Sequence, residues 1–269
     1  MSNALQKSFV HREPTRNELE LFRLSLSTFQ DGSGQLKVKS GTLPGWRDFE
    51  RTVGEVTNGM GTEDKSIFDV LVPGVTATQL HIGLSCKMRK ELSRVDRDGR
   101  VTIELSNSSK KMWEALGESH LTARSYKRHA TKVGKTLVNL ITRWHSAAAI
   151  HRTYRVNINK SYYLSLQWDL GTGKYQLFSF PLQLPDPDSL NWYFTDSSKG
   201  HLNGDDQNGG RVFEWYGESG GQLKYYPLSS EALWKTPVFA LEPVPASVSA
   251  SLAVKAAAYF PELWNSALS

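Results

Sequence analysis

The sequence predicts an α/β protein whose C-terminal part is rich in β-structure. Three features of the 269-residue chain indicate this fold class. Apolar residues recur at helical spacing in several segments, three segments between residues 66 and 105 have the pattern of strands, and aromatic strand-like runs dominate after residue 154. With 39% hydrophobic and 22% charged residues, the chain has the composition of a folded globular protein.

Two helices are predicted before the first strand. Thr15-Arg16-Asn17-Glu18 has the pattern of a capping box, and apolar residues follow at helical spacing until Asp31. A second helix is predicted to begin at Pro44 and to end at Asn58-Gly59. Glu50 borders the apolar stripe of this second helix, so we expect its carboxylate to lie near the sheet.

Three strands are predicted at residues 66–72, 79–87 and 100–105. In the second strand, apolar residues alternate with His81, Gly83, Ser85 and Lys87. Because strand side chains alternate between the two faces of a sheet, the polar ones share a face. We therefore expect a polar patch that neighbouring strands build together from Asp69, Ser85, Lys87 and Glu104.

A long helix is predicted from about Thr122 to His151, after a shorter one through Trp113 and Leu116. On a helical wheel its apolar residues gather on one side, which predicts a core helix with a cationic outer face. The basic residues of that outer face include Arg124, Arg128, Lys132 and Lys135.

The C-terminal part is predicted to begin with a hairpin of residues 162–168 and 175–180, joined by a glycine turn. Further short aromatic strands and a terminal helix at residues 252–259 follow. A composition shift near residue 155 divides the chain into residues 1–155 and 156–269, and the two parts can still belong to one domain.

The distribution of charge favours nucleic acid as the partner. Residues 81–160 carry 17 lysines and arginines against 6 aspartates and glutamates, whereas the segments on either side have more acidic than basic residues. A concentrated basic region attracts a phosphate backbone, although a solvated basic surface has the same composition.

Neither membrane insertion nor export is expected, because the chain has no run of 18 apolar residues and no apolar signal core near Met1. We therefore expect a cytoplasmic protein. Cys86 is the only cysteine, which excludes an internal disulfide and a zinc site built from cysteines.

An aspartate near one strand and a lysine on the next, with further carboxylates nearby, suit metal-assisted hydrolysis of a phosphodiester. Carboxylates hold Mg²⁺, which activates a water and offsets the charge on the scissile phosphate, and a lysine orients the water or stabilises the phosphate oxygens. The spacing of Asp69 and Lys87 alone is weak evidence, since ordinary hairpins often have it.

Four segments together resemble the type II restriction endonucleases built on the PD-(D/E)xK nuclease core: Glu50, Ser66-Ile67-Phe68-Asp69, Gly83-Leu84-Ser85-Cys86-Lys87 and Ile103-Glu104-Leu105-Ser106. The resemblance covers roughly residues 43–115. It implies a mixed central sheet flanked by helices, with residues 1–155 as the nuclease core including the basic helix. Two departures are Ile67-Phe68, where a proline commonly precedes the aspartate, and Ser85, which replaces the acid two positions before the lysine.

The resemblance implies that Asp69 binds metal and that Lys87 assists the attacking water. In the branch of the family with Ser-x-Lys, the missing carboxylate comes from elsewhere in the fold, and three glutamates compete for that role. Glu104 ranks first because it is predicted on the polar face beside Lys87. Glu50 ranks next as an outer metal ligand or structural acid, and Glu91 ranks third; each can also be an ordinary solvated glutamate.

The predicted function is Mg²⁺-dependent, site-specific cleavage of double-stranded DNA; a symmetric DNA site favours a homodimer, with monomeric action as the alternative. Alternatives are a repair or junction-resolving nuclease with the same core, and a non-catalytic module that binds nucleic acid or sugar. Six basic residues are predicted to contact DNA, the first three near the scissile bond and the others on the backbone: Arg89, Lys90, Arg94, Arg124, Arg128 and Lys132.

Overall fold

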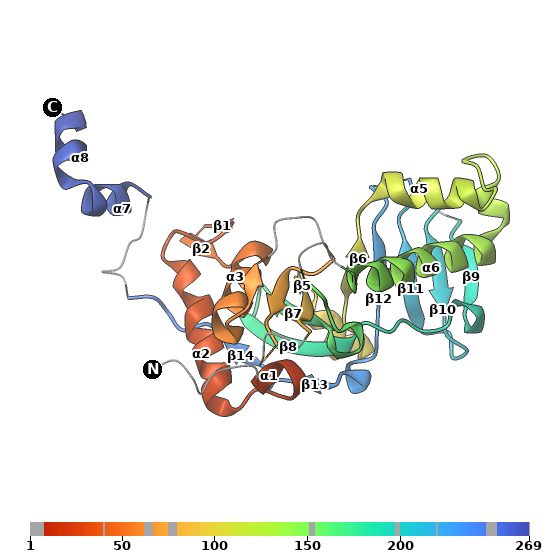
Figure 1. The fold of residues 1–269 in the computed structure, drawn as a ribbon, viewed down its shortest axis with the longest axis horizontal. Coiled ribbons are helices and arrows are strands. Elements are labelled where there is room, and N and C mark those ends of the chain that lie inside the picture. Colours follow the sequence, from red (N-terminus) through yellow and green to blue (C-terminus); the bar gives the residue numbers. More distant parts are fainter. Residues whose placement is uncertain are drawn as a thin grey trace.

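The protein is described from a computed structural model for residues 8–39, 41–61, 67–74, 80–150, 154–196, 200–218, 220–245 and 252–268. Ser66, Gln79 and His151, which belong to predicted elements, lie outside these residues. The described chain has a mixed α/β architecture with two larger sheets and one two-stranded sheet (Figure 1). Its helices are α1 (Ser8–His11), α2 (Arg16–Ser27), α3 (Trp46–Thr57), α4 (Leu92–Asp98), α5 (Ser109–Glu118), α6 (Ala130–Ala148), α7 (Leu252–Tyr259) and α8 (Pro261–Leu268).

The largest sheet is mixed, as predicted. Its strands are β3 (Met60–Gly61), β4 (Val70–Val72), β5 (Ile82–Arg89), β7 (Tyr162–Asp169), β8 (Lys174–Pro181), β13 (Trp234–Lys235) and β14 (Phe239–Ala240). They follow the order β13-β8-β7-β5-β4-β3, and β14 also pairs with β8. Strands β5 and β7 are parallel, whereas the other neighbours are antiparallel. The predicted hairpin is confirmed as β7 and β8, and Gly173 in its turn has a φ of 65°, which glycine adopts without steric cost.

Helices α2 and α3 cover one face of this sheet. The predicted capping box of α2 is confirmed, because the Glu18 N–H donates to Thr15 Oγ1 and the Thr15 N–H donates to Glu18 Oε2 at 2.7 Å. Helix α3 ends before Asn58, which has a left-handed φ of 52°. The buried side chains of this layer are Phe22, Leu26, Phe49, Val53, Val70, Leu84, Cys86, Leu164 and Leu166.

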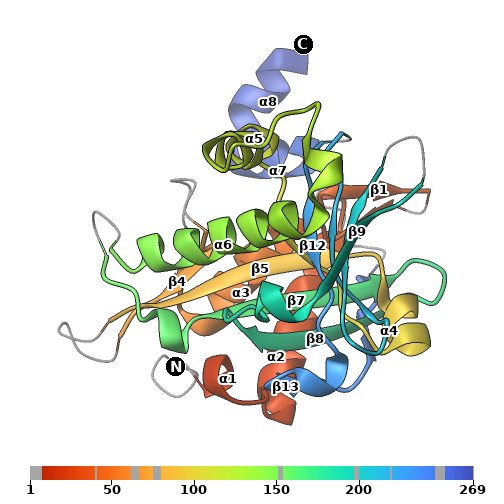
Figure 2. The same cartoon turned by 90° about the vertical axis from the view of Figure 1, so that its right-hand side faces the viewer.

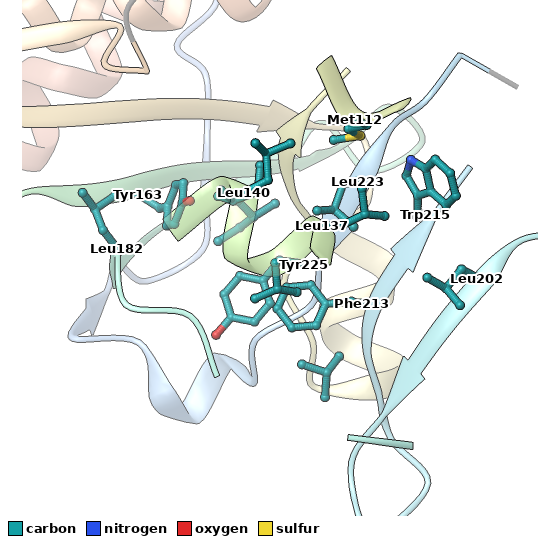
Figure 3. Packing of buried hydrophobic residues seen from close by; sticks show 14 of the residues in the cluster. Met112, Leu137, Leu140, Tyr163, Leu182, Leu202, Phe213, Trp215, Leu223 and Tyr225 are labelled. Carbon is teal, nitrogen blue, oxygen red and sulfur yellow. The ribbon is translucent and has the colours of Figure 1, made fainter. Parts of the chain in front are cut away.

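Helix α6 packs against the opposite face of the same sheet and also against the second larger sheet (Figures 2 and 3). Its buried residues Leu137 and Ile141 share one apolar cluster with Tyr163 of β7 and Phe213 of the second sheet. The helix begins at Ala130, later than predicted. Residues 122–128 form turns instead, including the 3₁₀ helix η2 (Tyr126–Arg128), because short-range hydrogen bonds close this segment on itself.

The second larger sheet is antiparallel and has the order β6-β12-β11-β10-β9. Its strands are β6 (Ile103–Ser106), β9 (Asn191–Phe194), β10 (Leu202–Asp205), β11 (Arg211–Trp215) and β12 (Leu223–Tyr225). The expectation that the strand of Glu104 neighbours the strand of Lys87 in one sheet is wrong. Strand β6 pairs with β12, much later in the chain, and a strand pattern by itself carries no information about its partner.

Short elements complete the described fold. Strands β1 (Leu36–Val38) and β2 (Gly41–Leu43) form the two-stranded sheet. The remaining 3₁₀ helices are η1 (Thr28–Gln30), η3 (Ile158–Lys160), η4 (Pro187–Ser189) and η5 (Ser229–Glu231). Both larger sheets combine strands from before and after residue 155, the composition boundary seen in the sequence. No helix within the described residues has the length and apolar character that crossing a bilayer requires.

Candidate active site

Asp69 lies at a bend immediately before β4. Phe68, the preceding residue, is buried against Gly83 of β5, where any Cβ would overlap the Phe68 ring. The Asp69 N–H donates to the carbonyl of Leu84 at 2.9 Å. The Asp69 carboxylate accepts a hydrogen bond from the backbone N–H of Cys86 at 2.7 Å. Backbone and side chain of Asp69 are therefore both fastened to β5.

Lys87 extends from β5 to the same carboxylate. Its Nζ is 3.0 Å from Asp69 Oδ2, and both side chains are partly exposed, at 21% for Lys87 and 24% for Asp69. Leu84 and Cys86 pack into the apolar layer beneath α3, so Ser85 and Lys87 belong to the other face by the two-residue period of a strand. Ser85, Cys86 and Lys87 all line the open cleft. The structure thus brings together the aspartate and lysine singled out in the sequence.

Glu50 of α3 interacts electrostatically with Asp69. Partial burial is the main cause that raises the pKa of Glu50 to about 7, and the negative charge of Asp69 raises it further. The positive charges of Lys87 and Arg47 oppose this rise but do not cancel it. At neutral pH, Glu50 therefore holds its proton more tightly than an isolated glutamate would.

Glu104, ranked first in the sequence, has a different partner. Its Oε2 accepts from Arg89 Nη1 at 2.7 Å and from Gln222 Nε2 at 3.4 Å. Glu104 lines the same cleft as Asp69, but from the second sheet. Glu91, the third candidate, accepts from the Thr102 hydroxyl at 2.5 Å and lies outside the lining of the cleft.

Ser85 and Cys86, the two residues before Lys87 on β5, also belong to the site. Ser85 is buried and contributes to the cleft lining. Cys86 is also buried, and this burial, together with the charge of Asp69, raises the pKa of its thiol well above the ordinary value. The Cys86 thiol therefore remains protonated and serves as a small core residue, as the strand pattern predicted.

The cleft that contains these residues has a volume of about 1300 Å³ and lies between helices on opposite faces of the largest sheet. Trp46 and Glu50 of α3 form one wall, and Trp144 and Ala148 of α6 belong to the other. This volume exceeds that of typical small-molecule pockets. The polar or aromatic lining residues that sequence reasoning missed include Trp46, Lys111, Trp144 and Gln222, because their convergence depends on packing between distant segments.

His145 is a buried polar residue that contributes to the lining of the cleft. Its Nε2 is 2.7 Å from the Tyr163 hydroxyl. Burial lowers the pKa of His145 to about 4, so its imidazole is neutral at physiological pH. The pair therefore connects α6 to β7 without adding charge to the cleft.

The basic residues predicted to contact DNA fall into two groups. Arg94 lies over the Tyr226 ring at 4.5 Å and is near Glu91, and Lys90 is near the Trp168 ring at 5.9 Å. Arg89 is engaged with Glu104 inside the cleft. The exposed residues Arg124, Arg128 and Lys132 precede or begin α6, whose C-terminal part lines the cleft about 20 Å further along the helix.

The donor set at Asp69 fits a magnesium ion. Mg²⁺ is usually bound by one or two carboxylates, together with waters and substrate phosphate oxygens. Glu50 and Asp69 supply two carboxylates whose mutual repulsion a cation would relieve. Within the described part of the chain, three or more histidine, cysteine, aspartate or glutamate side chains do not gather into one metal-binding group. The residues therefore suit an ion that completes its shell with water and substrate.

Comparison with known proteins finds no matching family model, no matching curated protein and no matching solved structure.

Proposed function

We propose that the protein is a Mg²⁺-dependent endonuclease of the PD-(D/E)xK type. The observation that carries this proposal is the contact of Asp69 with Lys87, beside Glu50, in an open cleft at the largest sheet. The chain order also supports it: an acid on α3, an aspartate before β4, Ser-x-Lys on β5, and a later helix on the opposite face of the sheet. The parallel pairing of β5 with β7 after that helix makes the sheet mixed, as the resemblance implies.

Ser85 stands where the family motif has an acidic residue, and we assign the role of that acid to Glu50. Burial raises the pKa of Glu50 most and the charge of Asp69 raises it further, whereas the carboxylate of Glu104 pairs with Arg89. In this assignment Asp69 and Glu50 would hold the ion, and Glu104 positions Arg89 in the lining of the cleft. The alternative ranking, with Glu104 as the metal ligand, requires the Arg89–Glu104 pair to separate.

Each residue of the site then has a role in hydrolysis. Bound Mg²⁺ would lower the pKa of the attacking water and offset charge on the scissile phosphate. Lys87 orients the water and donates to phosphate oxygens as their charge increases. The Cys86 N–H holds Asp69 in place while Lys87 turns toward substrate, so the carboxylate keeps its orientation.

Double-stranded DNA cut at a specific sequence is the proposed substrate, as for a type II restriction endonuclease acting in the cytoplasm. The basic excess of residues 81–160 supports a nucleic-acid ligand. A symmetric site would favour a homodimer.

The proposal is tested by incubating plasmid DNA with the protein and Mg²⁺ or EDTA. We expect cleavage only with Mg²⁺, and a loss of roughly 100-fold or more in Asp69→Asn and Lys87→Ala. Asp31→Asn and Lys37→Ala, which change the same residue types outside the cleft lining, are the controls. Discrete fragments support a restriction enzyme, and nicks at distorted DNA support a repair or junction-resolving nuclease. Metal-independent binding without cleavage would refute the enzyme and favour a binding module.

A further inference from the structure

Both walls of the cleft carry a tryptophan with a basic side chain beside its ring. On the α3 wall, the Arg47 guanidinium carbon is 4.9 Å from the centroid of Trp46. On the other wall, Lys111 Nζ is 5.5 Å from the centroid of Trp144. These distances are typical of cation–π contacts, which orient a cation without neutralising it.

Neither of these two basic side chains is engaged in a close ion pair within the described part of the chain. Within the described residues, Arg47 and Lys111 form no ion pair with a carboxylate. Their neighbours on the same helices differ in this respect, because Arg51 is 3.9 Å from Asp48 and Lys110 is 3.9 Å from Glu114. Lys111 thus lines the cleft without a close acidic partner, and Arg47, beside the lining residue Trp46, interacts with Glu50 only through longer-range electrostatics.

Trp46 also presents an open aromatic surface. Trp46 lines the cleft and is 48% exposed, although a large apolar ring is usually mostly buried. Trp144 is only half-buried and packs partly against the core, so it mainly supports Lys111. A basic groove with an exposed aromatic ring is the combination with which proteins bind unpaired nucleotides.

We propose that the cleft binds a DNA strand with one unstacked nucleotide beside the scissile phosphate. The base stacks on Trp46, and Arg47 and Lys111 contact phosphates on the two walls. This inference rests on the proposed function, because it takes the ligand of the cleft to be DNA. It implies that DNA with an unpaired segment binds more tightly than intact duplex, since unpairing a base from a duplex requires free energy.

The test measures binding in EDTA, where cleavage does not intervene. Fluorescence anisotropy would compare a short labelled duplex with the same duplex carrying a single-stranded gap. We expect the gapped DNA to bind more tightly, and Trp46→Ala to weaken its binding at least about fivefold while largely removing the preference for the gap. Arg47→Ala and Lys111→Ala should each lower the slope of log affinity against log salt by about 0.7.

Arg51→Ala and Lys110→Ala are the matched controls, and we expect both to keep the wild-type salt slope. Equal affinity of the wild-type protein for duplex and gapped DNA, or an unchanged preference in Trp46→Ala, would overturn the inference. If Mg²⁺-dependent cleavage is absent but the gap preference depends on Trp46, the proposed nuclease activity fails while the binding site stands. If cleavage occurs without that preference, only this inference fails.

Discussion

Replacing Glu50 by glutamine should make the metal-free protein more stable at neutral and alkaline pH while abolishing cleavage. The partly buried carboxylate of Glu50 lies beside Asp69, and both burial and the neighbouring charge raise its pKa to about 7. Glutamine has nearly the same shape and carries no charge. The substitution therefore removes an unfavourable interaction and, if our assignment holds, a metal ligand.

The size and sign of the effect follow from the difference in pKa between folded and unfolded chains. A rise from 4.5 to about 7 means that the folded protein binds the Glu50 proton more tightly. The resulting stability is present in full below about pH 4.5 and is lost as pH rises through about 7. The shift corresponds to about 3 kcal/mol. Because the carboxylate faces an open cleft, screening reduces this figure, and we expect about 1–2 kcal/mol.

Urea unfolding in EDTA at about pH 4 and about pH 8 measures this difference. Glu50→Gln should match the wild-type protein at the lower pH and exceed it at the higher one. Glu55→Gln, on an exposed position of the same helix, should change neither. Added Mg²⁺ should stabilise the wild-type protein at the higher pH and leave Glu50→Gln unchanged. Equal destabilisation of Glu50→Gln at both pH values would refute the reasoning.

Three further predictions concern the surroundings of the site. A double-mutant cycle of Arg89→Ala and Glu104→Ala, measured by urea unfolding, should give a coupling free energy of about 0.5–3 kcal/mol. Glu104→Gln should retain more cleavage activity than Glu50→Gln. The reverse order of activities would favour Glu104 as the metal ligand. Burial lowers the pKa of His145 from 6.5 to about 4. The free energy of unfolding of the wild-type protein should therefore fall by about 2–3 kcal/mol as the pH falls from 6.5 to 4. The stability of His145→Gln should depend less on pH over this range. Gly83→Ala should lose about 1–3 kcal/mol and reduce cleavage because the new methyl group displaces Phe68 and the aspartate after it; unchanged melting and activity would contradict this packing argument.

Much of the candidate site could be inferred from local patterns. The alternation in residues 82–87 placed Lys87 opposite the apolar side chains of its strand, and the helical stripe of α3 placed Glu50 beside the sheet. Both inferences depend only on the period of a strand or helix, which neighbouring residues determine. The ranking of the glutamates depended instead on a strand pairing. Because β6 pairs with β12, Glu104 reaches the cleft from another sheet and meets Arg89 there.

The sequence by itself determined the class of fold, the capping of α2, the β7–β8 hairpin and the faces of β5, since these features arise from interactions between residues close in the chain. Only the tertiary structure decided which acid lies beside Asp69 and which cations lie beside the tryptophan rings of the cleft. It also brought Trp46 and Trp144 to opposite walls. These arrangements depend on how α3 and α6 pack on the two faces of one sheet. The burial of apolar surface drives such packing but is not directional, so a short segment of sequence does not specify which distant segment it will contact.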